Sequence, residues 1–149
     1  MTFALTAEQL EGIPYGTGKR LRELESRLGE FLASPIIHFD DSCRRRLPDD
    51  HGVYRIFELG KSDSTIRAGR TKTAIGGLRQ RVYQNHLMGN QAGNLRTQLV
   101  SDRTAADLAS AKKMIRERYA VQVLVIRDRQ ERVWFEHFML AALRPLYCD

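Results

Sequence analysis

The sequence predicts an α+β fold in which helices flank a small antiparallel sheet. Three stretches rich in β-branched and aromatic residues, at 52–59, 65–70 and 120–126, have the composition of strands. Apolar residues recur at helical spacing before, between and after these stretches. Because only the short polar segment 60–64 separates the first two strands, we expect them to form a hairpin. The expected architecture is a three-stranded sheet flanked by helices and preceded by a helical arm.

Residues 1–50 are expected to form this N-terminal helical arm, packed on the core. Thr6 and Gln9 make a capping-box pattern that opens a short helix. Leucine and phenylalanine recur every three or four residues over 21–32, which predicts a longer amphipathic helix. The remainder of the arm is polar and turn-rich, apart from a short extended piece at 36–39.

The core is expected to span residues 51–149 as a hairpin, three helices, a strand and a last helix. After the hairpin, the expected elements are a helix that follows Gly76-Gly77, a short helix at 94–100, a helix capped by Thr104 that reaches about Arg118, a central strand at 120–126 and a helix at 133–143. The charged residues 127–130 are expected to form the turn before this last helix.

The composition indicates a soluble, basic, globular protein. The chain has 149 residues, 42% of them hydrophobic and 28% charged, and a net charge of +6, which argues against disorder and weakly favours a polyanionic partner. The longest apolar run, 138–143, is far shorter than the roughly 20 residues that span a bilayer. With only Cys43 and Cys148, neither a disulfide framework nor a CxxC zinc pair is expected. We expect a cytoplasmic protein with no membrane segment and no signal peptide.

Several short sequence pieces follow one another along the predicted core. They are Gly52-Val-Tyr54 on the first strand, Ala68-Gly-Arg-Thr71 at the end of the second, Leu78-x-x-Arg81 on the next helix, and Glu136 nine residues before Pro145 on the last helix. In this order they resemble the GIY-YIG nuclease superfamily over residues 51–149. The resemblance implies a small three-stranded antiparallel sheet flanked by helices. It also implies a metal-dependent endonuclease that hydrolyses DNA phosphodiester bonds with a single metal ion.

The resemblance gives four residues a catalytic role. Tyr54 is expected to be the general base, Arg81 to hold the scissile phosphate, His86 to be the histidine that often follows this arginine, and Glu136 to bind one Mg²⁺ or Mn²⁺. A phenol, with a pKa of about 10, needs nearby cations to act as a base. Mg²⁺ is often held by one carboxylate together with water and phosphate oxygens. Glu131 is a rival to Glu136 as the metal ligand.

Basic residues gather around these positions and are expected to bind DNA. They are Arg67, Arg70, Lys72, Arg79 and Arg96. A run of charge is usually a solvated surface, but cations around a phosphate-handling constellation favour a groove for the nucleic-acid backbone.

The sequence departs from the family pattern at three positions. Arg67 stands where the second motif usually has a tyrosine, and Cys148 where the last motif usually ends in asparagine. His86 follows Arg81 by five positions rather than four. On an α-helix this extra residue rotates a side chain by about 100°, and a loop or bulge near Asn85 could correct the offset.

Two other interpretations stay open. Arg67 could mark a catalytically weak or inactive nucleic-acid-binding module of the same fold, or the helix at 19–33 could dock on a partner protein. The discriminating feature is whether Tyr54, Arg81 and Glu136 line one concave surface. Tyr54 and Glu136 on opposite sides of the sheet would rule against an enzyme.

Overall fold

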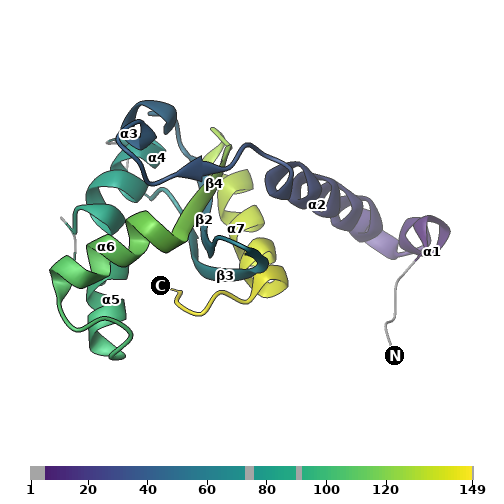
Figure 1. Ribbon diagram of the computed structural model, residues 1–149. Coiled ribbons are helices and arrows are strands. Elements are labelled where there is room, and N and C mark those ends of the chain that lie inside the picture. The colour runs from purple at the N-terminus through teal and green to yellow at the C-terminus, as the bar shows by residue number, and fades with distance from the viewer. Residues whose placement is uncertain (1–5, 73–75, 90–91, 149) are drawn as a thin grey trace. The chain divides into compact units, whose positions relative to one another are not determined.

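The computed structural model describes residues 6–72, 76–89 and 92–148 and divides the chain into two compact units, Met1–Ala33 and Ser34–Asp149 (Figure 1). The boundary therefore falls after residue 33, whereas the sequence places it after residue 50. Residues 34–50 belong to the second unit because a strand within them pairs with the sheet.

The first unit contains two helices and a short turn between them. These elements are α1 (Ala7–Glu11), the 3₁₀ turn η1 (Pro14–Gly16) and α2 (Thr17–Leu32). The predicted capping box is confirmed, because the Thr6 hydroxyl accepts from the amide of Gln9 and the Gln9 side chain accepts from the amide of Thr6. The predicted amphipathic helix is confirmed as α2.

A four-stranded antiparallel sheet forms the centre of the second unit, in the order β1-β4-β2-β3. Its strands are β1 (Ile37–His38), β2 (Gly52–Glu58), β3 (Lys61–Arg70) and β4 (Tyr119–Val125). The predicted hairpin is confirmed as β2 and β3, and the predicted central strand as β4. The expectation of three strands is wrong, because Ile37 and His38 pair with Val121 and Ala120 of β4 and add a fourth.

Helices cover the sheet, so the α+β class is confirmed. They are α3 (Cys43–Arg46), α4 (Gly77–Arg79), η2 (Gln80–Leu87), α5 (Leu95–Ser101), α6 (Leu108–Arg118) and α7 (Arg129–Leu143). Several boundaries differ from the prediction: β3 begins at Lys61 rather than at Thr65, and Asp107 rather than Thr104 caps α6. Asp128 caps α7, so half of the expected turn at 127–130 is helix. In the described part of the chain, no helix is long and apolar enough to cross a membrane.

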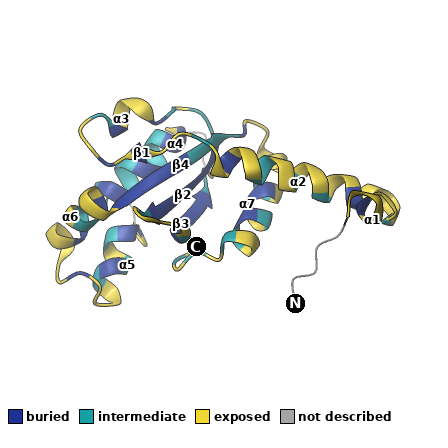
Figure 2. Ribbon diagram, turned by 45° about the vertical axis from the view of Figure 1, so that its right-hand side comes forward, coloured by how far each residue is buried: buried dark blue, intermediate teal, exposed yellow. Residues whose placement is uncertain are grey.

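The two faces of the sheet are covered by different helices, as Figures 1 and 2 show. Side chains alternate along β2, so Tyr54 and Ile56 point to one face and Val53 to the other. The Tyr54 face packs against η2, α5 and α6, whose apolar residues form the main core with Tyr54 and Ile56. The opposite face packs against α7, whose Phe135 is fully buried.

The C-terminal segment covers the free edge of β3. The amide of Leu146 donates to the carbonyl of Thr65 at 3.0 Å, and the amide of Tyr147 donates to the carbonyl of Ile66 at 2.8 Å. An edge strand otherwise presents a row of unpaired backbone groups that invites association with other strands. This contact therefore protects the strand that carries Arg67.

Candidate functional site

Two glycines fix the start of the helical segment that carries Arg81 and His86. Gly76 and Gly77 have φ angles of 80° and 52°, a conformation that favours glycine. A β-carbon on Gly77 would lie 1.9 Å from the carbonyl oxygen of Asp49. Only glycine allows the segment to begin this close to the preceding backbone, and this close approach positions η2 against the sheet.

The segment η2 is a π-helix, in which an amide bonds to the carbonyl five residues earlier. The pattern ends with the amide of Met88, which donates to the carbonyl of Tyr83 at 2.9 Å. Residues five apart in a π-helix therefore take the relative positions that residues four apart have in an α-helix. Arg81 and His86 are five residues apart, one more than in the GIY-YIG pattern. Because they lie on a π-helix, both nevertheless line one pocket.

His86 and Tyr54 form a buried hydrogen-bonded pair. Tyr54 Oη and His86 Nε2 are 2.7 Å apart, and both side chains are buried. The other ring nitrogen, Nδ1, accepts a hydrogen bond from the amide of Leu95 at 3.2 Å. A neutral imidazole that accepts at Nδ1 carries its hydrogen on Nε2. His86 therefore donates to the phenolic oxygen of Tyr54, which stabilises negative charge on that oxygen.

Gly69 makes room for the Tyr54 ring. The two residues are direct partners in the β2–β3 pairing. A β-carbon at position 69 would lie 3.1 Å from Tyr54 Oη, which is closer than ordinary van der Waals contact. The glycine of the second motif thus lets the phenol lie across β3 and reach His86.

Burial and two cations hold His86 in its neutral form. Desolvation lowers the pKa of His86 well below its ordinary value, and the charges of Arg67 and Arg81 lower it further. The imidazole is therefore neutral near pH 7 and keeps its hydrogen-bond donor at Nε2.

We expect acid to destabilise the fold through His86. The pKa of His86 is lower in the folded chain than its unfolded value of about 6.5, so below that pH the unfolded state binds the extra proton. Stability is then full above about pH 6.5 and falls with pH below it, by up to about 1.4 kcal/mol per pH unit. Urea unfolding at about pH 7, 6 and 5 measures this slope. His86→Gln should flatten it and His137→Gln, an exposed control on α7, should not; an unchanged slope in His86→Gln would contradict the prediction.

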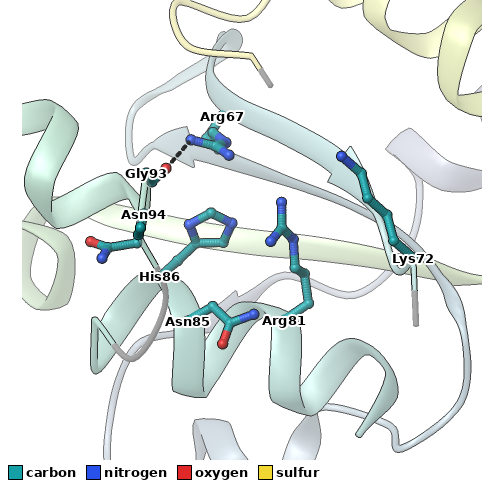
Figure 3. Close-up of a pocket in the computed structure, with 8 residues that line it drawn as sticks. Arg67, Lys72, Arg81, Asn85, His86, Gly93 and Asn94 are labelled. Atoms are coloured by element: carbon teal, nitrogen blue, oxygen red, sulfur yellow. Dashed lines mark hydrogen bonds between the residues drawn. The ribbon is translucent and has the colours of Figure 1, made fainter. Parts of the chain in front are cut away.

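The Tyr54–His86 pair adjoins a strongly basic pocket of about 220 Å³ (Figure 3). Its described lining residues are Arg67, Lys72, Arg81, Asn85, His86, Ala92, Gly93 and Asn94. In Figure 3 the side chains of Arg81 and His86 extend from η2 towards Arg67. Three of these lining residues are cations and none of them is acidic, so the pocket suits an anion such as a phosphate group.

Arg67 is built into the wall of this pocket. Its side chain is buried, and its Nη1 donates to the carbonyl of Gly93 at 3.0 Å and to Oε1 of Gln98. A fixed cation therefore stands at the position where the GIY-YIG nucleases, which the sequence resembles, usually have a tyrosine. A guanidinium that is already ordered attracts an anion without first losing side-chain freedom.

Glu136 lies outside the pocket, on the other face of the sheet. Its Oε1 accepts from Arg70 Nε at 3.1 Å. Arg70 is the partner of Val53, whose side chain points away from that of Tyr54, so Arg70 and Glu136 meet on the face opposite Tyr54. The expectation that Tyr54, Arg81 and Glu136 line one concave surface is therefore wrong for this structure.

Two of the arginines that are predicted to bind DNA make contacts within the protein. Arg79 Nε donates to the carbonyl of Leu47 at 3.0 Å, and its Nη1 pairs with Asp49 at 2.8 Å. Arg96 Nη1 donates to the carbonyl of Met88 at 2.7 Å. Neither arginine is among the described residues that line the pocket, so these contacts give both a local structural role.

Two asparagines of the pocket were not predicted as site residues. Asn85 lies on η2, and Asn94 caps α5 by accepting from the amide of Thr97 at 3.1 Å. Their one sequence signal is the polar composition of residues 85–94, which ordinary surface loops share. The π-helical geometry that turns Asn85 towards the pocket has no signature in the residue pattern.

In this structure the Glu136 carboxylate is buried and paired with Arg70, so it does not present an open metal site. In the described ranges, no three His, Cys, Asp or Glu side chains gather into a metal-binding group. Mg²⁺ commonly takes one carboxylate and completes its shell with water and phosphate oxygens, so Glu136 suffices if Arg70 moves aside from Oε1. The rival Glu131 is exposed in the first turn of α7.

The arrangement can bind a phosphate group in the basic pocket and stabilise negative charge on Tyr54 behind it. Comparison with known proteins assigns this arrangement to no family: no model of a known protein family matches the chain, and no curated protein matches it either.

Proposed function

We propose that the chain is an endonuclease that hydrolyses phosphodiester bonds of DNA. The observation that carries the proposal is the Tyr54–His86 hydrogen bond of 2.7 Å beside a pocket whose described lining holds three cations and no acid. Only the phenolate form of Tyr54 can take a proton from the attacking water and become a phenol, and the hydrogen bond donated by His86 Nε2 would stabilise that phenolate before the transfer. Tyr54 and Arg81 also carry the resemblance to the GIY-YIG nucleases, whereas Arg67 and the spacing of His86 depart from it.

The pocket accounts for phosphate binding and for charge stabilisation. Negative charge grows on the phosphate oxygens as the attacking water adds. Arg81 and Lys72 line the pocket from η2 and from the segment after β3, and Arg67 forms its fixed wall. Ordered cations at this point lower the barrier because they do not have to reorganise during the reaction.

Glu136 lies at the same end of β3 as the pocket, although on the other face. Arg70, which holds Glu136, is followed two residues later by Lys72, which lines the pocket. Two residues of extended chain span at most about 7 Å, so a phosphate bound at this strand end lies near both faces. If a divalent cation were held by Glu136 after Arg70 moved aside, it would supply neutralisation of charge on the leaving oxygen.

A second candidate is a nucleic-acid-binding module that does not cut. Two observations favour it. Tyr54 has no exposed surface, and Glu136 is paired with Arg70 on the face opposite Tyr54. Tyr54 and Glu136 on opposite faces are the arrangement that the sequence analysis expected to count against an enzyme. In this interpretation the basic pocket binds backbone phosphate and the catalytic groups stay apart.

The test is cleavage of supercoiled plasmid by the pure chain with Mg²⁺, Mn²⁺ or EDTA, beside duplex binding followed by fluorescence anisotropy. We expect nicked or linear plasmid with either cation and none with EDTA. If the protein neutralises about six DNA phosphates, a plot of the logarithm of duplex affinity against the logarithm of salt concentration should have a slope of about −5. Binding without cleavage in any cation would select the second candidate, and neither binding nor cleavage would refute both.

A further inference from the structure

Arg132 of α7 is a buried cation whose described hydrogen bonds all go to backbone carbonyls. The residue is 4% exposed. Its Nε donates to the carbonyl of Thr71 at 3.2 Å, and its Nη1 donates to the carbonyls of Ile126 and Arg127 at 2.9 and 3.1 Å. These bonds replace the water contacts that a guanidinium loses on burial. Arg132 therefore ties α7 to the chain just after β3 and just after β4.

Thr71 is held from two sides. On the side of β2, its amide donates to the carbonyl of Gly52 at 3.0 Å, and its hydroxyl accepts from the amide of Gly52 at 3.2 Å. The same hydroxyl lies 2.9 Å from His51 Nδ1. On the side of α7, the carbonyl of Thr71 accepts from Arg132. The contacts with β2 fix the amide and the side chain of Thr71, whereas Arg132 holds its carbonyl.

The carbonyl that Arg132 holds belongs to the peptide group that joins Thr71 to Lys72. A peptide group is planar, so a carbonyl held in place also fixes the amide of the next residue and the position of its α-carbon. Lys72 lines the basic pocket together with Arg67 and Arg81 (Figure 3). A lysine side chain has a long flexible stem, so the direction in which it leaves the backbone decides where its ammonium group can reach.

The charge of Lys72 lies in a part of the chain that contains no acid. Residues 64–101 include six Lys and Arg side chains and no Asp or Glu, and every residue that lines the pocket falls within this range. The positive charge of the pocket is therefore not offset by an acid from the same stretch of chain. An anion that enters the pocket gains most when all three cations of the lining face it.

We propose that Arg132 is a positioning residue, which acts through the carbonyl of Thr71 to aim Lys72 into the pocket for phosphate binding. The inference rests on the proposed function, because it takes the basic pocket as the phosphate site. Arg132 lies on α7, which covers the opposite face of the sheet, and it does not line the pocket. Its effect on phosphate affinity therefore has to pass through Lys72.

The experiment measures binding of inorganic pyrophosphate to the full chain by isothermal titration calorimetry, at low salt and without nucleic acid. Lys72→Gln should weaken binding about tenfold, the usual effect of losing one hydrogen bond to a charged group. Arg132→Lys keeps the charge, but a compact ammonium group cannot replace the planar fork that reaches three carbonyls. We expect this variant to weaken binding by about three- to tenfold. In the Lys72→Gln background, Arg132→Lys should change affinity by less than about twofold, because residues that act through one another are not additive.

Arg129→Lys is the matched control, because it makes the same chemical change at an exposed position of α7. It should leave pyrophosphate affinity unchanged within about twofold, and circular dichroism checks that each variant is folded. If Arg132→Lys does not fold, Thr71→Val takes its place in the same cycle, since it deletes the hydroxyl that holds the same residue from the side of β2. Unchanged affinity in the variant assayed, an equal loss with and without Lys72, or no pyrophosphate binding by the unmodified chain would overturn the proposal.

Failure of this positioning role and failure of the nuclease give different results, because the pyrophosphate titration contains no nucleic acid. A chain that loses affinity with Arg132→Lys only when Lys72 is present, but never cuts plasmid, keeps the positioning role and loses the nuclease activity. A chain that cuts plasmid and shows the same pyrophosphate affinity with Arg132→Lys keeps the nuclease activity and loses the positioning role.

Discussion

Tyr54→Phe is expected to slow DNA cleavage by about 10²–10⁴-fold, the usual contribution of a positioned general base. The substitution deletes only the hydroxyl that His86 contacts at 2.7 Å. The pocket cations Arg67, Lys72 and Arg81 remain, so duplex affinity should stay within about twofold of the unmodified chain, because backbone contacts dominate such binding. Single-turnover cleavage and anisotropy on the same duplex measure the two quantities.

The same substitution also lowers the stability of the fold, and the experiment has to separate this loss of stability from the loss of catalysis. The buried Nε2–H of His86 loses its hydrogen-bond acceptor. This loss lowers the free energy of unfolding by about 1–3 kcal/mol. Urea unfolding shows whether the variant is still folded under assay conditions. Tyr119→Phe is the matched control, because the hydrogen bond that its hydroxyl donates within the described residues is a weak one, to Met114 Sδ at 3.6 Å. This variant should cut at the unmodified rate. Cleavage by Tyr54→Phe at the rate of Tyr119→Phe would remove Tyr54 from the mechanism.

The fold was predictable where local composition and burial agree. β2 and β4 are rich in β-branched and aromatic residues and are largely buried, and the capping box of α1 has a fixed four-residue pattern. β1 is only Ile37–His38, too short for any periodic signal. For α6, Thr104 and Asp107 are both good caps, so the sequence alone could not choose between them.

The candidate site was less predictable, because its geometry depends on two backbone irregularities. The π-helix changes which residues lie on the same face of the helix. A pattern analysis that assumes 3.6 residues per turn cannot detect this change. The β2–β3 pairing shifts register on either side of Phe57. A shift of one residue moves a side chain to the other face of a sheet, so the sequence could not show that Arg70 and Tyr54 point to opposite faces.

Glu136→Gln is expected to lower cleavage by about 10³-fold or more while duplex binding stays equal or becomes slightly tighter. A bound cation contributes several kcal/mol of charge stabilisation in such reactions, and each 1.36 kcal/mol is about tenfold in rate. The amide is a poorer cation ligand than the carboxylate and does not repel phosphate. Its oxygen can still accept from Arg70 Nε, and glutamine has nearly the same helix propensity as glutamate, so α7 should survive.

Glu131→Gln provides the comparison, because it makes the same chemical change in the exposed first turn of α7. It should cut at the unmodified rate, since Glu131 is not the residue that Arg70 holds. Loss of cleavage in Glu131→Gln with retention in Glu136→Gln would mean that the last motif is aligned wrongly by about one helical turn. Retention in both variants would mean that cleavage needs neither of these α7 carboxylates, and the single-metal mechanism at Glu136 would be wrong.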